Sequence, residues 1–420
     1  MTGLLAELIF GARRPTDFAS RPSVPGILTV AAVCLSVGLI MRPVSRSLSK
    51  KKEVFIQSPQ KSISPVLPKN LPYPPDALPG ARDVETPYGS IRVYEWGPED
   101  GDRVLFVHGI STPVIALGGL GHDLVARGKR VMMFDLFGRG YSDAPSDLTY
   151  DARLYTTQIL LVLASSNLAW TTGEGFHLLG YSLGGGITVA FARYFPHLLR
   201  SLSLIAPSGL IRKRHVGWRS SLYYNSGLLP EFLVRYLVRR RIRPTVEQLP
   251  APTDGAAGGT DIARAETTSQ PSGGVKGDGD SNGGKGFNSA AVSKNRPHVT
   301  VSSVVAWQVD HHKGFLTAFL STIRNAPIYA PSVNWEELSE VLAIRRNAIA
   351  AGEKIEGLEK GKVFIVLGEG DGVICKDEII ADATAVLGYE GVEFVVLPDG
   401  HELPFTNSEG VAERLEAFWQ

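Results

Sequence analysis

Residues 176–192 read FHLLGYSLGGGITVAFA, and this stretch decides how the chain is built. The apolar run at its start is typical of a strand buried on both faces, and the run at its end is typical of a helix. Residues 180–184, GYSLG, thus form a G-x-S-x-G turn between a strand and a helix. Such a turn strains the backbone of Ser182 and lifts its hydroxyl above the sheet edge, while the flanking glycines leave room for it. The sequence therefore predicts a reactive serine at the carboxyl end of a buried strand.

Strand-like and helix-like segments alternate on both sides of this turn. Strand patterns cover 90–96, 103–108, 130–135, 176–181, 200–206, 363–367 and 392–397. Helical patterns cover 151–165, 182–194, 377–387 and 409–419. Several strands are unbroken apolar runs, as suits parallel strands covered on both faces. We expect an α/β fold with a mostly parallel eight-stranded sheet and helices on both faces, formed in two parts by residues 81–210 and 362–420.

The alternation stops after the fifth strand, and we expect residues 211–361 to form a helical lid inserted into this core. Within the lid, residues 250–294 contain ten glycines and a single aromatic residue. Such a composition buries too little apolar surface to order a chain, so residues 245–298 are expected to be disordered.

The N-terminal region carries an uncharged apolar run at 25–41, PGILTVAAVCLSVGLIM. As a helix extended to residue 44, with Arg42 reaching back to the headgroups, it could cross a hydrocarbon core of about 30 Å. We therefore expect a single transmembrane helix at 24–44, after a tail at 1–23. A linker at 45–80, rich in proline, would follow it as an extended spacer. A cleaved targeting segment and a buried core helix are the alternatives.

Charges and cysteines indicate on which side of a membrane the domain would lie. Basic residues follow the apolar run closely, at Arg42, Arg46, Lys50, Lys51 and Lys52, whereas Arg13, Arg14 and Arg21 precede it. The positive-inside tendency then places the C-terminal domain in the cytosol. The chain has only two cysteines, Cys34 and Cys375, which agrees with a reducing compartment. The arginines of the N-terminus leave a mitochondrial address as the alternative.

Overall composition excludes several classes of function. The chain has 43 Lys and Arg against 42 Asp and Glu, so no global charge favours nucleic acid. Two cysteines rule out a disulfide framework and a four-cysteine zinc site, and with no phosphate-binding motif we expect neither metal nor cofactor. Residues 212–243 are an exception to the balance, with nine basic residues and one acid, Glu231. This part of the lid is either an ordinary solvated helix or a surface for an anionic membrane.

A serine hydroxyl needs a base, and nine histidines are available. His401, in LPDGHELPF, lies between the last strand and the final helix, where a loop could bring it to Ser182. His311 and His312 lie in the insertion, where a solvated or core position is expected, and His108 is expected to pack in the turn after its strand. We therefore predict that His401 is the base.

The base in turn needs a carboxylate to orient it. Asp371, in the segment GEGDG after the strand 363–367, is the predicted partner. Glu369 is its rival and is expected to face solvent, while Asp399 lies too near His401 in sequence to fold back onto the ring. An oxyanion would need two backbone donors, and we assign the N–H groups of Leu183 and Ile110, with Ser111 as second choice for the latter.

Four motifs in chain order, VLFVHG, FDLFGRGYSD, GYSLGGG and GEGDGVI…DGHE, resemble those of lid-bearing α/β-hydrolases. This family includes carboxylesterases, monoacylglycerol-lipase-like enzymes and C–C bond hydrolases. The resemblance covers residues 82–210 and 362–420, and it implies the order Ser182, Asp371, His401. It implies an acyl-enzyme mechanism on a carboxylic, lipid-like ester. The glycine-rich and basic stretches of the lid depart from the family, and the lid sets substrate choice.

The same residues could serve a thioesterase, an acyltransferase, a peptidase or a C–C hydrolase. A non-catalytic ligand-binding protein of this fold is a further alternative, although such proteins usually lack the serine or the histidine. Relatives with aspartate in place of Ser182 are epoxide hydrolases and haloalkane dehalogenases, so the serine speaks against those activities.

Overall fold

Two sheets and their flanking helices make up the part of the chain that the computed structural model describes, namely residues 54–62, 71–215, 229–243, 284–292 and 296–420. The predicted span at 24–44 lies outside these residues, as does most of the tract at 245–298. No helix within the described ranges is long and apolar enough to cross a membrane.

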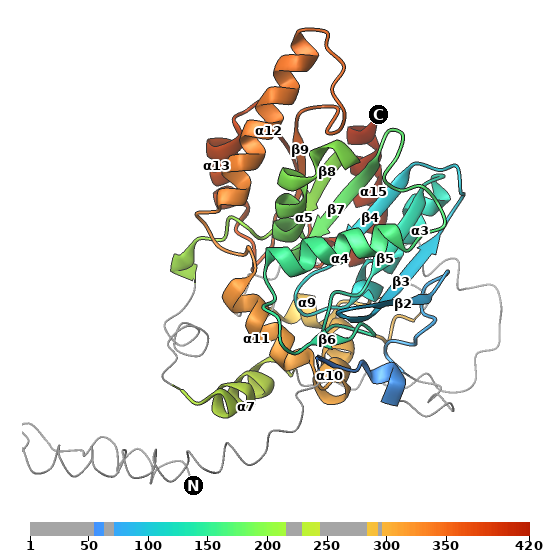
Figure 1. The fold of residues 1–420 in the computed structure, drawn as a ribbon. Helices are drawn as coiled ribbons and strands as arrows, with labels where there is room; N and C mark the ends of the chain where they lie inside the picture. The colour runs from blue at the N-terminus through green and yellow to red at the C-terminus, as the bar shows by residue number, and fades with distance from the viewer. Residues whose placement is uncertain (1–53, 63–70, 216–228, 244–283, 293–295) are drawn as a thin grey trace, which may run out of the picture. The chain divides into compact units, whose positions relative to one another are not determined.

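The main sheet has eight strands in the order β10-β9-β8-β7-β4-β5-β3-β2, and all run parallel except β3 (Figure 1). Their bounds are β2 Arg82–Thr86, β3 Gly89–Trp96, β4 Arg103–Val107, β5 Arg130–Phe134, β7 Phe176–Tyr181, β8 Leu199–Ile205, β9 Val363–Gly368 and β10 Val392–Leu397. The central strands β4, β7, β8 and β9 are almost wholly buried, as unbroken apolar runs require. The predicted fold class, a mostly parallel eight-stranded α/β sheet, is confirmed.

Helices cover both faces of this sheet. One face carries α4 Ala152–Ala164, α5 Leu183–Tyr194, α12 Val333–Ala350 and α13 Lys376–Leu387, and the other carries α3 Gly118–Ala126 and α15 Ser408–Trp419. Short helices complete the core at η2 Val114–Leu117, η3 Pro196–Leu198 and α14 Leu403–Thr406. Trp335, Leu338 and Leu342 of α12 are buried in its contact with α5 and α13. The predicted lid, 211–361, included α12, but this helix belongs to the core. The parallel neighbours β8 and β9 need a crossover helix between them, and α12 is that helix.

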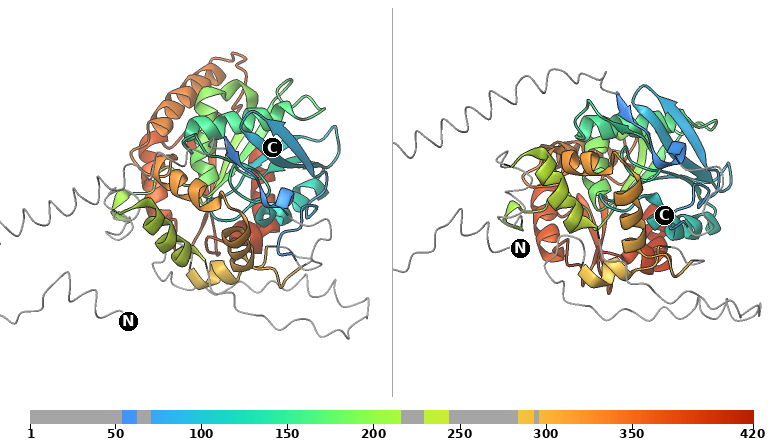
Figure 2. Two further views of the ribbon diagram at one scale, coloured as in Figure 1. Left: turned by 60° about the horizontal axis from the view of Figure 1, so that its bottom comes forward. Right: turned by 90° about the horizontal axis from the view of Figure 1, so that it is seen from below.

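The helices of the insertion proper gather at one end of the sheet (Figure 2). They are α7 Glu231–Ile242, α9 Gly284–Ser289, α10 Val301–His311 and α11 Phe315–Asn325, with the short η4 Lys213–His215 at the entry. Helix α10 packs against the other three. The prediction that residues 245–298 are disordered is wrong for α9 and for the segment after it, because Phe287, Ala290 and Val292 are buried among the lid helices.

The predicted linker, 45–80, is also partly folded onto the core. Strand β1 Phe55–Ile56 pairs with β6 Ala144–Pro145, and the helical turn η1 Pro59–Ser62 follows it. Tyr73 is wholly buried, and its hydroxyl donates to Asp135 Oδ2 at 2.8 Å. The expectation of a free spacer overlooked these anchors, because prolines dominate the local composition while the packing partners lie far along the chain.

Candidate active site

Ser182 stands in a strained turn between β7 and α5, with φ 51° and ψ −116°. Close packing enforces this turn. A Cβ on Gly180 would lie 2.5 Å from Gly184 O, and a Cβ on Gly184 would lie 2.0 Å from Val107 O, so neither position admits a side chain. Hydrogen bonds hold the serine backbone, whose N–H donates to Ile205 O at 3.0 Å. The hydroxyl is thereby presented at the carboxyl end of the strands.

His401 and Asp371 complete a chain of hydrogen bonds with this serine. His401 Nδ1 lies 2.8 Å from Asp371 Oδ2, and His401 Nε2 lies 3.1 Å from Ser182 Oγ. With Nδ1–H donating to the carboxylate, Nε2 is left to accept the serine proton. The other oxygen of Asp371 accepts the N–H groups of Val373 and Ile374 at 2.7 and 2.8 Å, which orients the carboxylate. The structure thus brings together the three side chains that the sequence singled out.

The rival acids and histidines lie elsewhere. The side chain of Glu369 is 65% exposed and lies 3.5 Å from Lys376 Nζ, while Asp399 accepts from Asn407 Nδ2 at 2.7 Å. His312 is buried between the lid and the core, where Nε2 lies 2.9 Å from Ser142 O, and burial lowers its pKa to about 4. His311 bonds to Trp307 O within its own helix at 2.9 Å. Each of these groups therefore has a local role apart from Ser182.

The loop after β4, which carries the predicted oxyanion donor Ile110, lies against the serine. A Cβ placed on Gly109 would lie 3.4 Å from the Cβ of Ser182. His108 is wholly buried at the start of this loop, and its ring bonds to Gly109 O at 2.8 Å and to the N–H of Leu136 at 2.9 Å. Burial lowers the pKa of His108 to about 3, so the ring stays neutral. Leu183 begins α5, so its N–H lies at the helix start beside Ser182.

Two buried side chains, Arg139 and Gln308, hold the loop after β4 in place through hydrogen bonds. Neither was among the site residues predicted from the sequence. Arg139, wholly buried, donates from Nε to Ile110 O at 3.1 Å and from Nη2 to Thr322 Oγ1 of α11 at 3.0 Å. Gln308 of α10 donates from Nε2 to Ser111 O at 2.8 Å and accepts the N–H of Gly140 at 2.9 Å. The GRGYS motif at residues 138–142 could have indicated a role for Arg139. Nothing in the local sequence points to Gln308, because the backbone atoms that it bonds lie 168 and 197 residues away.

Aromatic rings close over the histidine. Phe287 of α9 lies 5.5 Å from the His401 ring and 6.0 Å from the Phe405 ring, measured between centroids. The Tyr181 ring lies 5.2 Å from the His401 ring, and the Tyr181 hydroxyl donates to His401 O at 2.9 Å. Glu402 is a second buried acid beside the histidine, and desolvation raises its pKa. The rings of Phe287 and Tyr181 thus give His401 apolar neighbours.

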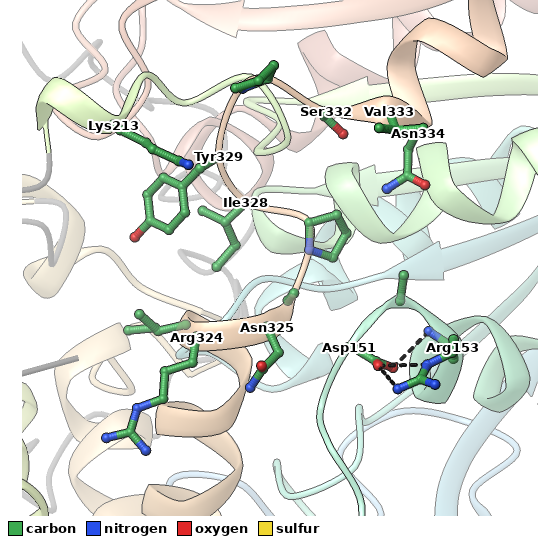
Figure 3. A pocket seen from close by; sticks show the side chains of 15 residues that line it. Asp151, Arg153, Lys213, Arg324, Asn325, Ile328, Tyr329, Ser332, Val333 and Asn334 are labelled. Atoms are coloured by element: carbon green, nitrogen blue, oxygen red, sulfur yellow. Dashed lines mark hydrogen bonds and ion pairs between the residues drawn. The ribbon is translucent and has the colours of Figure 1, made fainter. Parts of the chain in front are cut away.

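A cleft of about 510 Å³ lies apart from these residues, between the start of α4, the end of α11 and the start of α12 (Figure 3). Asp151, Arg153, Lys213 and Arg324 give it a charged wall, and Asp151 is already bonded to Arg153. None of the residues around Ser182 lines it. Among the described residues, no group of three or more His, Cys, Asp or Glu side chains is placed to hold a metal ion.

The sequence matches the alpha/beta hydrolase fold family over residues 102–407, so the chain belongs to that family. It is 30% identical over 122 residues to lipase 1 of Psychrobacter immobilis, which is 29% of this chain and 37% of that protein. It is 30% identical over 112 residues to 2-hydroxymuconate semialdehyde hydrolase of Pseudomonas sp. strain CF600, which is 26% of this chain and 38% of that protein. The alignments thus span less than half the length of these curated relatives.

The fold has a counterpart among solved structures in a bacterial membrane phospholipase A, with a TM-score of 0.51. The match covers 94% of this chain and 96% of that one, at 15% sequence identity. This likeness concerns the fold alone. Family membership, the strained serine and the hydrogen-bonded histidine together define a member of the alpha/beta hydrolase fold family with a serine placed beside a base.

Proposed function

We propose that this protein is a serine hydrolase that cleaves carboxylic esters through an acyl-enzyme on Ser182. The observation that carries the proposal is the continuous chain of hydrogen bonds from Asp371 through His401 to a serine in a strained turn. That arrangement activates a hydroxyl that would otherwise be a poor nucleophile. The local likeness to a lipase and the apolar rings around His401 favour an acyl ester as the substrate.

The geometry suggests the steps of the reaction. Ser182 Oγ attacks the carbonyl carbon while His401 Nε2 takes the hydroxyl proton, and the N–H groups of Leu183 and Ile110 receive the oxyanion. The tetrahedral intermediate collapses, and the alcohol leaves with the proton from His401. Water then attacks the acyl-enzyme with His401 as base, which releases the carboxylic acid and restores the serine.

Reaction with a labelled fluorophosphonate tests this proposal, because only an activated serine is captured. We expect the wild-type chain to be labelled and Ser182→Ala to lose both labelling and ester turnover, by several orders of magnitude in rate. Ser332→Ala, at the edge of the charged cleft, is the matched control and should behave as wild type. Persistent labelling of Ser182→Ala would contradict the assignment. A panel of glycerides, short acyl esters, thioesters and amides then resolves the bond that is cleaved.

Membrane anchoring is a separate part of the proposal, and it rests on the apolar run 25–41 and the basic residues after it. The full chain should remain in the membrane pellet after carbonate extraction, with the hydrolase domain accessible to protease from the cytosolic side. Release by carbonate, or protection of the domain, would contradict the predicted span or its orientation.

A further inference from the structure

Helix α7 has two opposite faces that differ in what they contact. Val234, Val238 and Ile242, four residues apart, are buried against α10 and α11. Two positions before each of these residues, Phe232, Tyr236 and Arg240 form a second line with the same spacing. Because two residues turn a helix by about 200°, this second line points away from the core. Phe232 is 75% exposed and Tyr236 is 60% exposed, which is unusual for large aromatic side chains.

Positive charge surrounds these aromatic rings. The helix and its cap carry Arg235, Arg239, Arg240, Arg241 and Arg243, and Glu231 is the one acid between them. Asp310 of α10 pairs with Arg239 at 3.0 Å and with Arg243 at 2.8 Å, while Glu231 pairs with Arg235 at 3.6 Å and Arg324 at 3.2 Å. Residues 231–243 themselves contain five arginines and one acid, a formal net charge of +4. The chain as a whole has a net charge of only +1, so this charge is local.

We propose that the outward face of α7 docks on the anionic surface of a lipid bilayer. Phe232 and Tyr236 would lie at the boundary between headgroups and acyl chains, and the arginines would contact anionic headgroups. Aromatic rings on a convex helix with flanking cations are the combination that binds a flat, anionic, amphiphilic surface, since burial and charge both contribute. A double-stranded nucleic acid would engage the arginines through its phosphates but leave the two rings in water. The surface is defined hereafter as the α7 face, residues Phe232, Tyr236 and Arg240 with Arg235 and Arg239.

The α7 face is joined to the site through α10. Helix α7 packs on α10, and α10 carries Gln308, whose amide bonds to the loop beside Ser182. A bilayer beneath α7 would therefore adjoin the lid that covers the site, which makes esters embedded in a bilayer the substrate class. That substrate class rests on the proposed hydrolysis, whereas the docking itself does not.

Fluorescence quenching tests the docking in the full chain, since vesicle binding alone could come from the predicted span at 24–44. A fluorophore is attached at Tyr236→Cys in a background of Cys34→Ser and Cys375→Ser, and the protein is reconstituted in vesicles with shallow spin-labelled lipids. The control label sits at Tyr389→Cys, which is 90% exposed and precedes β10, at the amino edge of the strands and opposite the lid. We expect quenching at position 236 and none at 389 in vesicles rich in phosphatidylserine, with loss of quenching as salt rises.

Three outcomes would overturn the docking: no quenching at 236 in anionic vesicles at low salt, equal quenching in neutral phosphatidylcholine vesicles at every salt concentration, or a response at 236 only to an acidic polypeptide. Activity gives a second readout. Tyr236→Ser with Arg240→Gln should lose hydrolysis of a vesicle-embedded ester while a soluble ester is cleaved as before. The matched control, Tyr389→Ser with Arg414→Gln, removes one exposed tyrosine and one exposed arginine elsewhere and should change neither. Failure of fluorophosphonate labelling would instead refute the hydrolase and leave the quenching result intact.

Discussion

At the scale of single residues, the site depends on one unfavourable backbone conformation. A serine at φ 51° costs on the order of 1–3 kcal/mol. Hydrogen bonds offset that cost, because Ser182 O accepts the N–H groups of Gly185 and Ser208 at 2.9 and 2.8 Å. The sequence predicted this turn because the glycines that permit it are adjacent in the chain. It also predicted His401 and Asp371, since both directly follow strands whose carboxyl ends share one edge of a parallel sheet.

Asp371→Asn should lower kcat for a soluble ester by about three to four orders of magnitude. An asparagine can still accept the N–H groups of Val373 and Ile374, but its amide cannot hold His401 in the tautomer that accepts the serine proton. Glu369→Gln is the matched control, because that exposed carboxylate lies beside Lys376 and should matter little. Steady-state kinetics of both variants check the assignment, and a larger loss in Glu369→Gln would transfer the role to Glu369.

At the scale of secondary-structure elements, the lid helices form hydrogen bonds with two core loops, the loop after β4 and the loop that carries Arg139 and Gly140. Gln308 of α10 bonds to both Ser111 in the loop after β4 and Gly140, and Thr322 of α11 accepts from Arg139. The lid therefore also holds the loops beside Ser182 in place. The sequence predicted only that the lid sets substrate choice. Sequence patterns do not reveal these bonds, because each bond joins a lid side chain to a group more than 160 residues away in the chain.

Gln308→Ala should lower kcat on a soluble ester by about tenfold or more, with little change in KM, because small displacements of oxyanion donors weaken catalysis strongly. Ser303→Ala on the same helix is the control. It removes the bond from the Thr300 N–H to the Ser303 hydroxyl, one half of the capping box, so it should lower stability by about 1 kcal/mol and leave kcat unchanged. Thermal unfolding and kinetics on both variants separate positioning from stability. Equal losses of kcat in the two variants would show that only lid stability matters.

At the scale of the whole domain, the segment before β2 is part of the core. Tyr73 donates to the buried Asp135, bonds to the Tyr94 hydroxyl at 2.9 Å and accepts at its carbonyl from the Tyr141 hydroxyl. Ser58 N–H donates to Asp143 Oδ1 at 2.7 Å. Asp135 is wholly buried, and this burial raises the pKa of its carboxyl group to about 6.

Tyr73→Phe should lower the free energy of unfolding by about 1–3 kcal/mol, because the buried Asp135 loses a donor that water cannot replace. Tyr389→Phe, at a ring that is 90% exposed, is the control and should have no effect. Denaturant unfolding of the two variants provides the measurement. Equal stability of Tyr73→Phe and wild type would mean that the segment before β2 does not stabilise the domain.

Stability should also fall as the pH falls below about 6.5, because three histidines are buried in their neutral form. Burial lowers the pKa of His108 and His177 to about 3 and that of His312 to about 4. Below their ordinary pKa, the unfolded chain binds protons that the folded chain does not, so each histidine removes about 1.4 kcal/mol per pH unit until its folded pKa is reached. Stability from these groups is thus present above the unfolded pKa and lost on acidification.

His177→Phe tests this dependence away from the catalytic residues, since a phenyl ring can still stack on Trp419, 4.3 Å away between centroids. Between about pH 6 and pH 4, the unfolding free energy of the variant should fall less steeply than that of wild type, by about 1.4 kcal/mol per pH unit. Denaturant titrations at several pH values measure the slopes. Parallel slopes would contradict a neutral, buried His177.

The sequence by itself determined the sheet, the strained serine and its two partners, because periodicity, glycine positions and strand ends are properties of adjacent residues. Only the tertiary structure decided that α12 covers the sheet, that Tyr73 belongs to the core and that Phe287 lies over His401. Tertiary structure also decided that Arg139 of the core and Gln308 of the lid fix the loop after β4. The physical reason is that burial and hydrogen bonding depend on partners distant in the chain, and local composition, whether rich in proline or in glycine, says nothing of those partners.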